Sequence, residues 1–265
     1  DNILPVVFFA IFTGITINKM GSSANSLRSF FHTMSKMVLK MISMIIVLSP
    51  YGAFALTAWM VGTQGLEVLL SLSKLVAAMT VAMLFQYLVF GLLILIFCQM
   101  SPMPFYRKSL EYQIIAISTG SSKASLSTTM KVCTDNLGIS DTSTSFVLPL
   151  GASINMDGTA IKLGLAALFV AQVMGMELSM MDYFVMILTS TIGSIGAAGI
   201  PGAFMVMLPM VLSSINLPIE AVALFAGVDR LLDLLSTTIN ITGDATITLI
   251  VDNSEGNLDK DKYYS

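Results

Sequence analysis

Nine residues, Gly-Ala-Ser-Ile-Asn-Met-Asp-Gly-Thr at positions 151–159, restrict the possible folds more than any other part of this chain. They lie within an apolar segment, residues 146–174, that otherwise reads as a membrane span. An Asp near the middle of a bilayer is costly unless it has a partner, and Gly and Asn favour a break in a helix. Broken backbone at that depth is tolerated where it lines a cavity or is buried in protein. We therefore expect a broken helix whose carbonyls and carboxylate bind a small cation. The alternative is a kinked helix with a structural Asp pair.

The composition indicates an integral membrane protein. Of the residues, 55% are hydrophobic and 11% are charged, whereas soluble domains average about 25% charged residues. The charges fall between apolar runs and form no basic stripe, so we expect no nucleic-acid partner. Cys98, Cys133 and His32 lack the spacing of a metal or catalytic site. We expect an all-α, multi-pass protein of the cell membrane that is not an enzyme.

The first part of the chain contains three apolar runs that we interpret as spans: residues 3–17, 37–61 and 75–97. Ser and Pro near position 50 predict a kink in the second span. The connections before and after these spans differ in charge. Those at 18–40 and 99–108 are basic, while those at 62–70 and 175–182 carry only acids. The positive-inside rule therefore places the basic connections in the cytoplasm.

Two later segments do not fit a single crossing. Residues 110–145 must enter and leave on the cytoplasmic side, so we expect a re-entrant hairpin with its tip near residues 118–125. A soluble amphipathic loop is the alternative. Residues 183–219 carry no Asp, Glu, Lys or Arg and are too long for one span. Gly and Pro residues in their middle break a helix, so we expect a second hairpin that enters from outside.

The last span, residues 221–250, carries polar groups at helical spacing on one face: Asp229, Asp233, Ser236 and Asn240. A hairpin followed by a polar-centred span thus occurs twice, with opposite orientation. An inverted repeat of this kind is typical of secondary transporters that bind their substrate near the bilayer midplane. We divide the chain into membrane spans at 1–109, a transport core at 110–251 and a charged cytoplasmic tail at 252–265.

These features resemble the dicarboxylate/amino acid:cation (sodium) symporter family, which has the glutamate transporter fold. The resemblance is carried by Ser121-Ser122, Asn155-Met156-Asp157-Gly158-Thr159, Ser194-Ile195-Gly196, Gly199-Ile200-Pro201-Gly202, and Asp229, Asp233, Asn240 and Asp244. It covers nearly the whole chain. It implies eight spans and two hairpins, of which the first three spans are absent here. It also implies a homotrimer in the lipid membrane and sodium-coupled symport of a small amino acid or dicarboxylate by alternating access.

The resemblance further implies three sodium sites. The first is formed by the Asp244 carboxylate with backbone carbonyls of Gly151, Asn155 and Asn240. The second is formed by backbone carbonyls of Ser153, Ser194, Ile195 and Ala197. The third lies near Asn155 and Asp157 and also needs residues of the absent third span.

For the substrate, the resemblance implies that Asp233 pairs with an amino group, while Asn240 and Ser122 meet the main carboxylate together with amides of both hairpin tips. The pocket is completed by Ser121, Thr159, Gly199 and Thr237. Carboxylates and carbonyls suit a hard cation, and helix N-termini at the hairpin tips suit an anionic group.

Three positions depart from the family pattern. Ser236 occupies the position where members with acidic substrates carry an Arg, and Ser cannot supply that charge. Gly120 stands where some members carry an Arg in the first hairpin. Leu163 stands where animal members carry a Glu linked to proton coupling, so we expect sodium coupling without proton cotransport by this route.

Two lysines could compensate for the missing arginines. We expect Lys162 or Lys123 to be the counter-charge for Asp233 or for a substrate carboxylate. The alternative is that Lys123 contacts cytoplasmic water and Lys162 snorkels towards the interface.

Other functions remain open at this point. A symporter of neutral amino acids would explain Ser236, and an ion channel would explain the cation site without explaining the repeat. An intramembrane aspartyl protease would use buried carboxylates, and Thr242-Gly243-Asp244 superficially suits one. That chemistry gives no reason for paired hairpins.

Overall fold

The computed structural model describes residues 4–46, 51, 54–55, 58, 62, 67–197 and 202–265. Within these residues the chain is helical and contains no strand. The elements before the first hairpin are α1 (Leu4–Lys19), the 3-10 turn η1 (Gly21–Ala24), α2 (Asn25–Ile46), α4 (Glu67–Leu93), the π-helical turn η2 (Ile94–Cys98) and α5 (Met103–Lys108). The remaining elements are α6 (Leu110–Thr119), α7 (Ser122–Asp135), α8 (Asp141–Ile154), α9 (Asp157–Val173), α10 (Met180–Gly196), α11 (Ala203–Ser214), the 3-10 segment η3 (Ile219–Phe225), α12 (Asp229–Ser254) and α13 (Lys260–Tyr264).

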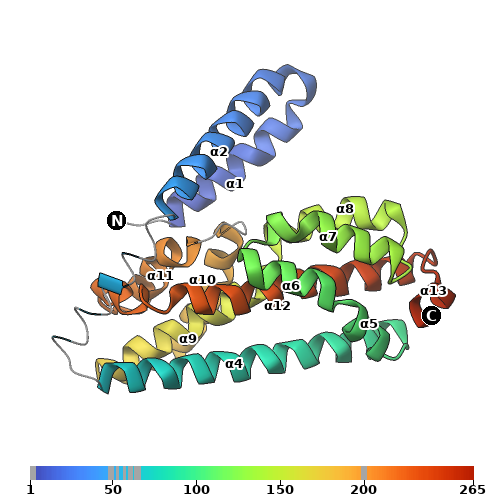
Figure 1. The fold of residues 1–265 in the computed structure, drawn as a ribbon. Coiled ribbons are helices and arrows are strands. Elements are labelled where there is room, and N and C mark those ends of the chain that lie inside the picture. Colours follow the sequence, from blue (N-terminus) through green and yellow to red (C-terminus); the bar gives the residue numbers. More distant parts are fainter. Residues whose placement is uncertain are drawn as a thin grey trace.

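Helices α1 and α2 form a hairpin that projects away from the other helices (Figure 1). The predicted polar connection at 18–40 is wrong, since only the turn around η1 joins the two helices and α2 already begins at Asn25. Arg28, His32 and Lys36 recur every four residues, so they form one polar stripe of a helix and not a loop. The predicted second span therefore starts inside α2. Its predicted kink at Pro50 lies outside the described residues.

Helix α12 is the centre of the remaining bundle, where it packs against α4, α6, α7, α8 and α9 (Figure 1). In its most apolar window 67% of the residues are buried, against 28% in the window of α4. α4 instead exposes Val81, Phe85 and Leu88 at helical spacing, which suits contact with lipid. Among the described residues, three helical segments could cross a membrane by length and composition: Leu70–Cys98, Asp141–Val173 and Asp229–Ser254.

The buried α12 is rich in hydroxyl side chains, and its own backbone partners many of them. Thr242, Thr246 and Thr248 each donate to the carbonyl four residues earlier, at 2.7, 2.7 and 2.6 Å. Such bonds satisfy a buried hydroxyl without a partner from another helix. They allow a helix of moderate hydropathy to lie at the centre of the bundle.

The two predicted hairpin segments each form a pair of packed helices. α6 and α7 meet at Gly120, whose φ of +62° is a left-handed conformation that favours glycine, and this turn lies within the predicted tip. α10 and α11 pack together in the same way, although residues 198–201 between them lie outside the described residues. Between the two hairpins, the predicted break in the central helix is confirmed, because α8 ends at Ile154 and α9 begins at Asp157.

The last span is shorter at its start than predicted. Residues 219–225 form the 3-10 segment η3, and α12 begins only at Asp229, eight residues after the predicted start at 221. An acidic residue in the first turn favours a helix start, because it complements the positive end of the helix dipole.

The charged tail predicted at 252–265 is folded against the bundle. Asp252 is buried and accepts hydrogen bonds from the Ser140 hydroxyl at 2.5 Å and the Ser140 N–H at 2.9 Å. Tyr263 is fully buried and donates to the Ser101 carbonyl at 2.8 Å, and this burial raises the pKa of its phenol. The buried Tyr263 ring belongs to an apolar cluster and holds this segment against the bundle.

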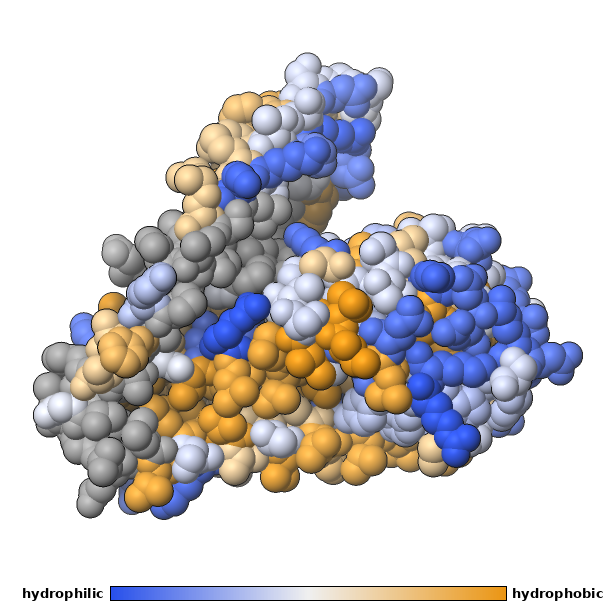
Figure 2. Space-filling view, in the orientation of Figure 1, coloured by the Kyte–Doolittle hydropathy of each residue, from blue (hydrophilic) through white to orange (hydrophobic). Residues whose placement is uncertain are grey.

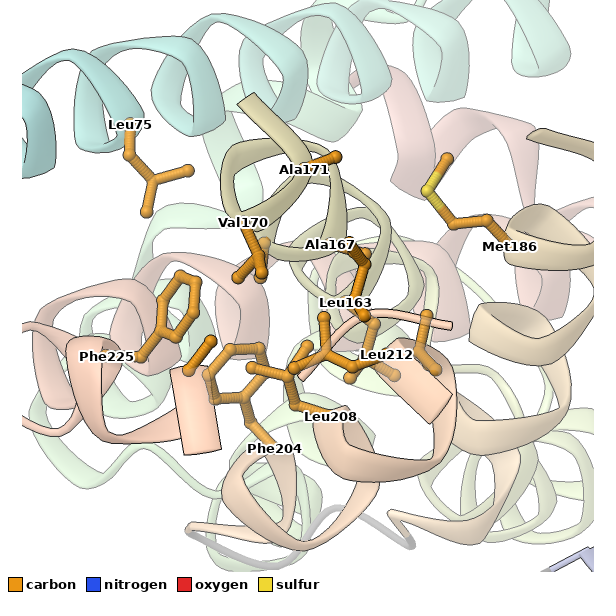
Figure 3. Packing of buried hydrophobic residues seen from close by; sticks show 14 of the residues in the cluster. Leu75, Leu163, Ala167, Val170, Ala171, Met186, Phe204, Leu208, Leu212 and Phe225 are labelled. Atoms are coloured by element: carbon orange, nitrogen blue, oxygen red, sulfur yellow. The ribbon is translucent and has the colours of Figure 1, made fainter. Parts of the chain in front are cut away.

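Buried apolar side chains form a core around α9, α10 and α11. Figure 3 shows Leu163 and Val170 of α9 above Phe204 and Leu208 of α11, with Phe225 beside them. The rings of Phe204 and Phe225 meet edge to face at 5.7 Å between centroids. On the outer surface, hydrophilic residues gather at the end that holds α13, and apolar residues extend along the helices (Figure 2). This distribution suits a bundle whose sides face lipid and whose α13 end faces water.

Candidate functional site

A small pocket lies where the two hairpins meet α9 and α12. Its lining comes from hairpin α6–α7 (Gly120 and Ser122), from hairpin α10–α11 (Ala197, Ala203 and Phe204), and from the two other helices (Thr159, Asp233, Thr237 and Asn240). The space open to the centre of a water molecule is about 10 Å³, close to the volume that one water requires. The pocket therefore has room for about one water molecule in this conformation.

The break between α8 and α9 places polar groups in the path of α12. The backbone of Asn155 is extended. The Asn240 side chain of α12 forms hydrogen bonds with groups at the start of α9. Its Oδ1 accepts from the Gly158 N–H at 2.8 Å, and its Nδ2 donates to the Thr159 hydroxyl at 3.1 Å. Asn240 thus accepts a hydrogen bond from the Gly158 N–H, which the break leaves without an acceptor in its own helix. It also fixes the register between the two helices.

Glycines permit this close packing. A methyl group at Gly158 would lie 2.3 Å from the Ser236 carbonyl oxygen, and one at Gly151 would lie 2.6 Å from Oδ1 of Asp244. Neither position therefore has room for a side chain. The glycines on either side of the central polar sequence are therefore required by packing as well as by the break.

Two carboxylates lie beside the break. Asp244 is buried, and its Oδ1 accepts from the Asn155 side-chain amide at 3.0 Å. Asp157 accepts from the side-chain amide of Gln86 in α4 at 3.4 Å. The ion pairs found in the described part of the chain involve neither of them. One amide donor each is weak compensation for a carboxylate in a dry environment.

Lys162 lies next to the pocket and is fully buried. Its Nζ is 2.6 Å from Oδ1 of Asp229 and 3.3 Å from Oδ1 of Asp233. It also lies 4.2 Å from the centre of the Phe204 ring. Snorkelling is therefore excluded for Lys162, and its expected contact with Asp233 is present. Lys123 is exposed on the first turn of α7.

Three residues of the site were not found from the sequence. Arg230 donates to the Thr119 carbonyl at 3.1 Å and lies against Gly120, so a guanidinium rests on the tip of the first hairpin. Gln86 and Phe204 contact Asp157 and Lys162 from helices that are distant in the sequence. The lone glutamine inside the apolar α4 was the signal that could have identified Gln86.

Several predicted residues lie elsewhere. Ser121 caps α7 by accepting from the Ala124 N–H at 3.3 Å, and it is not among the pocket lining. Ser236 is buried, and its hydroxyl donates to the Asp233 carbonyl of its own helix at 3.1 Å, outside the pocket. Gly199 lies outside the described residues.

The residues predicted for the second sodium site belong to two helices. Ser153 is near the end of α8, whereas Ser194, Ile195 and Ala197 are at the end of α10. Ser194 is buried and donates to the Thr191 carbonyl at 2.8 Å. Among the described residues no three His, Cys, Asp or Glu side chains gather as metal ligands. Any cation here would rely on carbonyl and amide oxygens as well as carboxylates, which hard cations accept.

Comparison with known proteins identifies the family. A model of the sodium:dicarboxylate symporter family matches residues 1–254. The chain is 36% identical over 247 residues to excitatory amino acid transporter 2 of Mus musculus, covering 92% of this chain and 43% of that protein. It is 36% identical over 251 residues to an excitatory amino acid transporter of Caenorhabditis elegans, covering 92% and 49%. It is 34% identical over 260 residues to the proton/glutamate-aspartate symporter of Escherichia coli, covering 98% and 59%.

The chain spans about half the length of these curated relatives. The match over nearly all of the chain's length confirms three predictions. The family consists of transporters and not of enzymes, and the family description names sodium as the ion. The chain is a multi-pass protein of the cell membrane. By this match, which runs through both hairpins, the broken helix and α12, the chain belongs to the sodium:dicarboxylate symporter family.

Proposed function

We propose that the protein is a sodium-coupled symporter that carries a small amino acid or dicarboxylate across the membrane by alternating access. The observation that carries this proposal is the pocket itself. The two hairpins, the broken helix and α12 are far apart in the sequence, and each contributes residues to one small cavity. Five of the eight residues predicted for the substrate line it: Ser122, Thr159, Asp233, Thr237 and Asn240.

The two carboxylates beside the break support sodium binding. Asp244 and Asp157 are held by amide groups alone among the contacts described above, so a cation would relieve the cost of their burial. We assign the first sodium to Asp244 with carbonyls of Gly151, Asn155 and Asn240, and the third to Asn155 and Asp157. Gln86 joins the third site, since its amide already reaches Asp157. The second sodium would use the carbonyls of Ser153, Ser194, Ile195 and Ala197.

The small volume of the pocket supports a moving gate. An amino acid or dicarboxylate is many times larger than one water, so it enters only when a hairpin tip moves away. Hairpin α6–α7 precedes the broken helix and hairpin α10–α11 precedes α12. We propose that the two units form an inverted repeat whose re-entrant hairpins open to opposite sides in turn.

We also propose a homotrimer. The projecting helices α1 and α2 expose large apolar side chains such as Phe12 and Phe30. An apolar surface of this kind contacts lipid or another protomer. Mass measurement of the protein in lipid nanodiscs tests this assembly, and a monomer there would contradict it.

Transport against a gradient separates a symporter from a channel. Protein that contains residues 1–265 is reconstituted in vesicles, and uptake of labelled aspartate, glutamate, serine, alanine and succinate is measured with and without an inward sodium gradient. We expect at least one solute to accumulate above its external concentration only while the gradient lasts. Equilibration without accumulation would instead indicate a channel. Accumulation of serine and alanine alone would favour the neutral amino acid symporter that Ser236 allows.

A further inference from the structure

The pocket contains one acidic side chain, and a cation of the protein itself is already bound to it. Asp233 lines the cavity, and Lys162 Nζ lies 3.3 Å from its Oδ1. In an amino acid symporter this carboxylate would be the natural partner of the substrate's ammonium. We propose that Lys162 takes the place of that ammonium, so that the protein selects solutes with carboxylates and no amino group. This inference rests on the proposed function and narrows its substrate class to dicarboxylates.

Besides Asp233, two further contacts hold Lys162 in this position. The shorter ion pair, 2.6 Å to Asp229, lies one helical turn before Asp233 on α12. The Phe204 ring faces the ammonium at 4.2 Å, and a desolvated cation over an aromatic face is well bound. Phe204 is itself buried and packed edge to face on Phe225. Because the side chain of Lys162 has no exposed surface, it cannot swing into water to leave Asp233 free.

The charge balance follows from these contacts. Asp229 and Asp233 face the Lys162 ammonium, and the Arg230 guanidinium rests on the hairpin tip at Gly120, which also lines the cavity, so cations of the protein already balance the two carboxylates. Removing one partner of a buried ion pair is costly. A substrate ammonium would have to share Asp233 with Lys162 at close range, and like charges repel strongly in a dry site. A solute without an ammonium meets no such repulsion.

The pocket also contains a polar group that could bind an anion and has no hydrogen-bond partner among the described residues. The Ser122 hydroxyl lines the pocket, is buried, and has no hydrogen-bond partner among the described residues. It stands at the N-terminus of α7, while Ala203 and Phe204 line the cavity at the N-terminus of α11. Ser122 and Ala203 are the first residues of α7 and α11, and the start of a helix carries the positive end of its dipole. Two carboxylate ends of one solute therefore find donors at opposite hairpins.

Succinate and aspartate test this inference, because they differ only in the ammonium group. Their affinities are measured in the presence of sodium by competition against a labelled dicarboxylate, using protein that contains residues 1–265. We expect the parent protein to bind succinate more tightly than aspartate, by about 10-fold or more. The reason is that the ammonium of aspartate leaves its hydrogen bonds to water and finds Asp233 already bound to Lys162. If the parent protein binds aspartate more tightly than succinate, that result alone overturns the proposal.

The double variant Lys162→Met with Asp229→Asn then frees Asp233 while the net charge of the cluster stays the same as in the parent. We expect the ratio of the two affinities to shift towards aspartate by about 10-fold or more. Lys131→Met, an exposed lysine farther along α7, is the matched control and leaves the ratio unchanged. An unchanged ratio in the double variant contradicts the role of Lys162. Absence of sodium-dependent binding of either solute to the parent overturns the proposed function itself, and this result is distinct from a ratio that fails to move.

Discussion

A single methyl group at Gly158 is predicted to separate the helices that build the site. In the parent the backbone of Gly158 touches α12 directly, and an added Cβ would lie 2.3 Å from the carbonyl oxygen of Ser236 and 2.8 Å from its Cα. These are backbone atoms, which no rotamer change can move. The two helices would have to shift by roughly 1 Å to reach ordinary contact.

The expected cost of Gly158→Ala has two parts. Overpacking of a tight contact costs about 1–3 kcal/mol. The hydrogen bond from the Gly158 N–H to Asn240, 2.8 Å in the parent, would lengthen and cost about 0.5–1.5 kcal/mol. Better helix propensity of Ala returns up to about 1 kcal/mol. We therefore expect a net loss of about 0.5–4.5 kcal/mol, together with weaker binding of the solute, because Thr159 moves with its neighbour.

Gly164 provides the matched control in the same helix. A methyl group there would have as its nearest neighbour the Ser190 hydroxyl at 3.9 Å, an ordinary contact. Gly164→Ala should leave stability unchanged or raise it by up to about 1 kcal/mol. Denaturant unfolding in mixed micelles and sodium-dependent solute binding are measured on both variants. If Gly158→Ala is as stable as Gly164→Ala and binds equally well, the close contact between α9 and α12 is refuted.

Three further predictions address other contacts. Asp252→Asn should cost about 1–3 kcal/mol, because it weakens two charge-assisted bonds from Ser140, and micelle unfolding measures it; a change within error contradicts the packed tail. Tyr263→Phe should cost about 1 kcal/mol near neutral pH through the lost bond to Ser101. Because burial raises the pKa of Tyr263, this advantage of the parent should shrink as pH rises above the usual tyrosine pKa of about 10; an advantage that grows would refute that burial. Gln86→Leu should weaken sodium binding several-fold and leave folding intact, as read by sodium titration of solute binding, and an unchanged sodium titration would remove Gln86 from the site.

The broken helix was predictable from the sequence because its cause is local. Gly151, Asn155 and Gly158 disfavour helix wherever they stand, and Asp157 inside an apolar run requires a partner in any fold. The hairpin turn at Gly120 was predictable for the same reason. Helical spacing also placed Asp229 and Asp233 on one face of α12, and Lys162 near the site.

Contacts between distant helices were not predictable in this way. Nothing near Arg230 in the sequence indicates that it rests on the tip of the first hairpin, or that Phe204 covers Lys162. Ser236 matched the position of an arginine in the family pattern, yet its short hydroxyl bonds to its own helix and does not reach the pocket. The start of α2 was missed because a basic stripe on an apolar helix gives the same local charge as a basic loop.

The sodium affinity of Asp244→Asn tests the central claim most directly, with Asp252→Asn as the control. Both are buried carboxylates of α12, and the same substitution is made in each, but Asp252 is held by Ser140 at the far end of the helix. Sodium binding is measured by titrating solute affinity in micelles. We predict that Asp244→Asn lowers sodium affinity by at least about 10-fold, since a charged ligand becomes neutral, while folded Asp252→Asn binds sodium like the parent. Equal sodium affinity in Asp244→Asn and the parent would contradict the account.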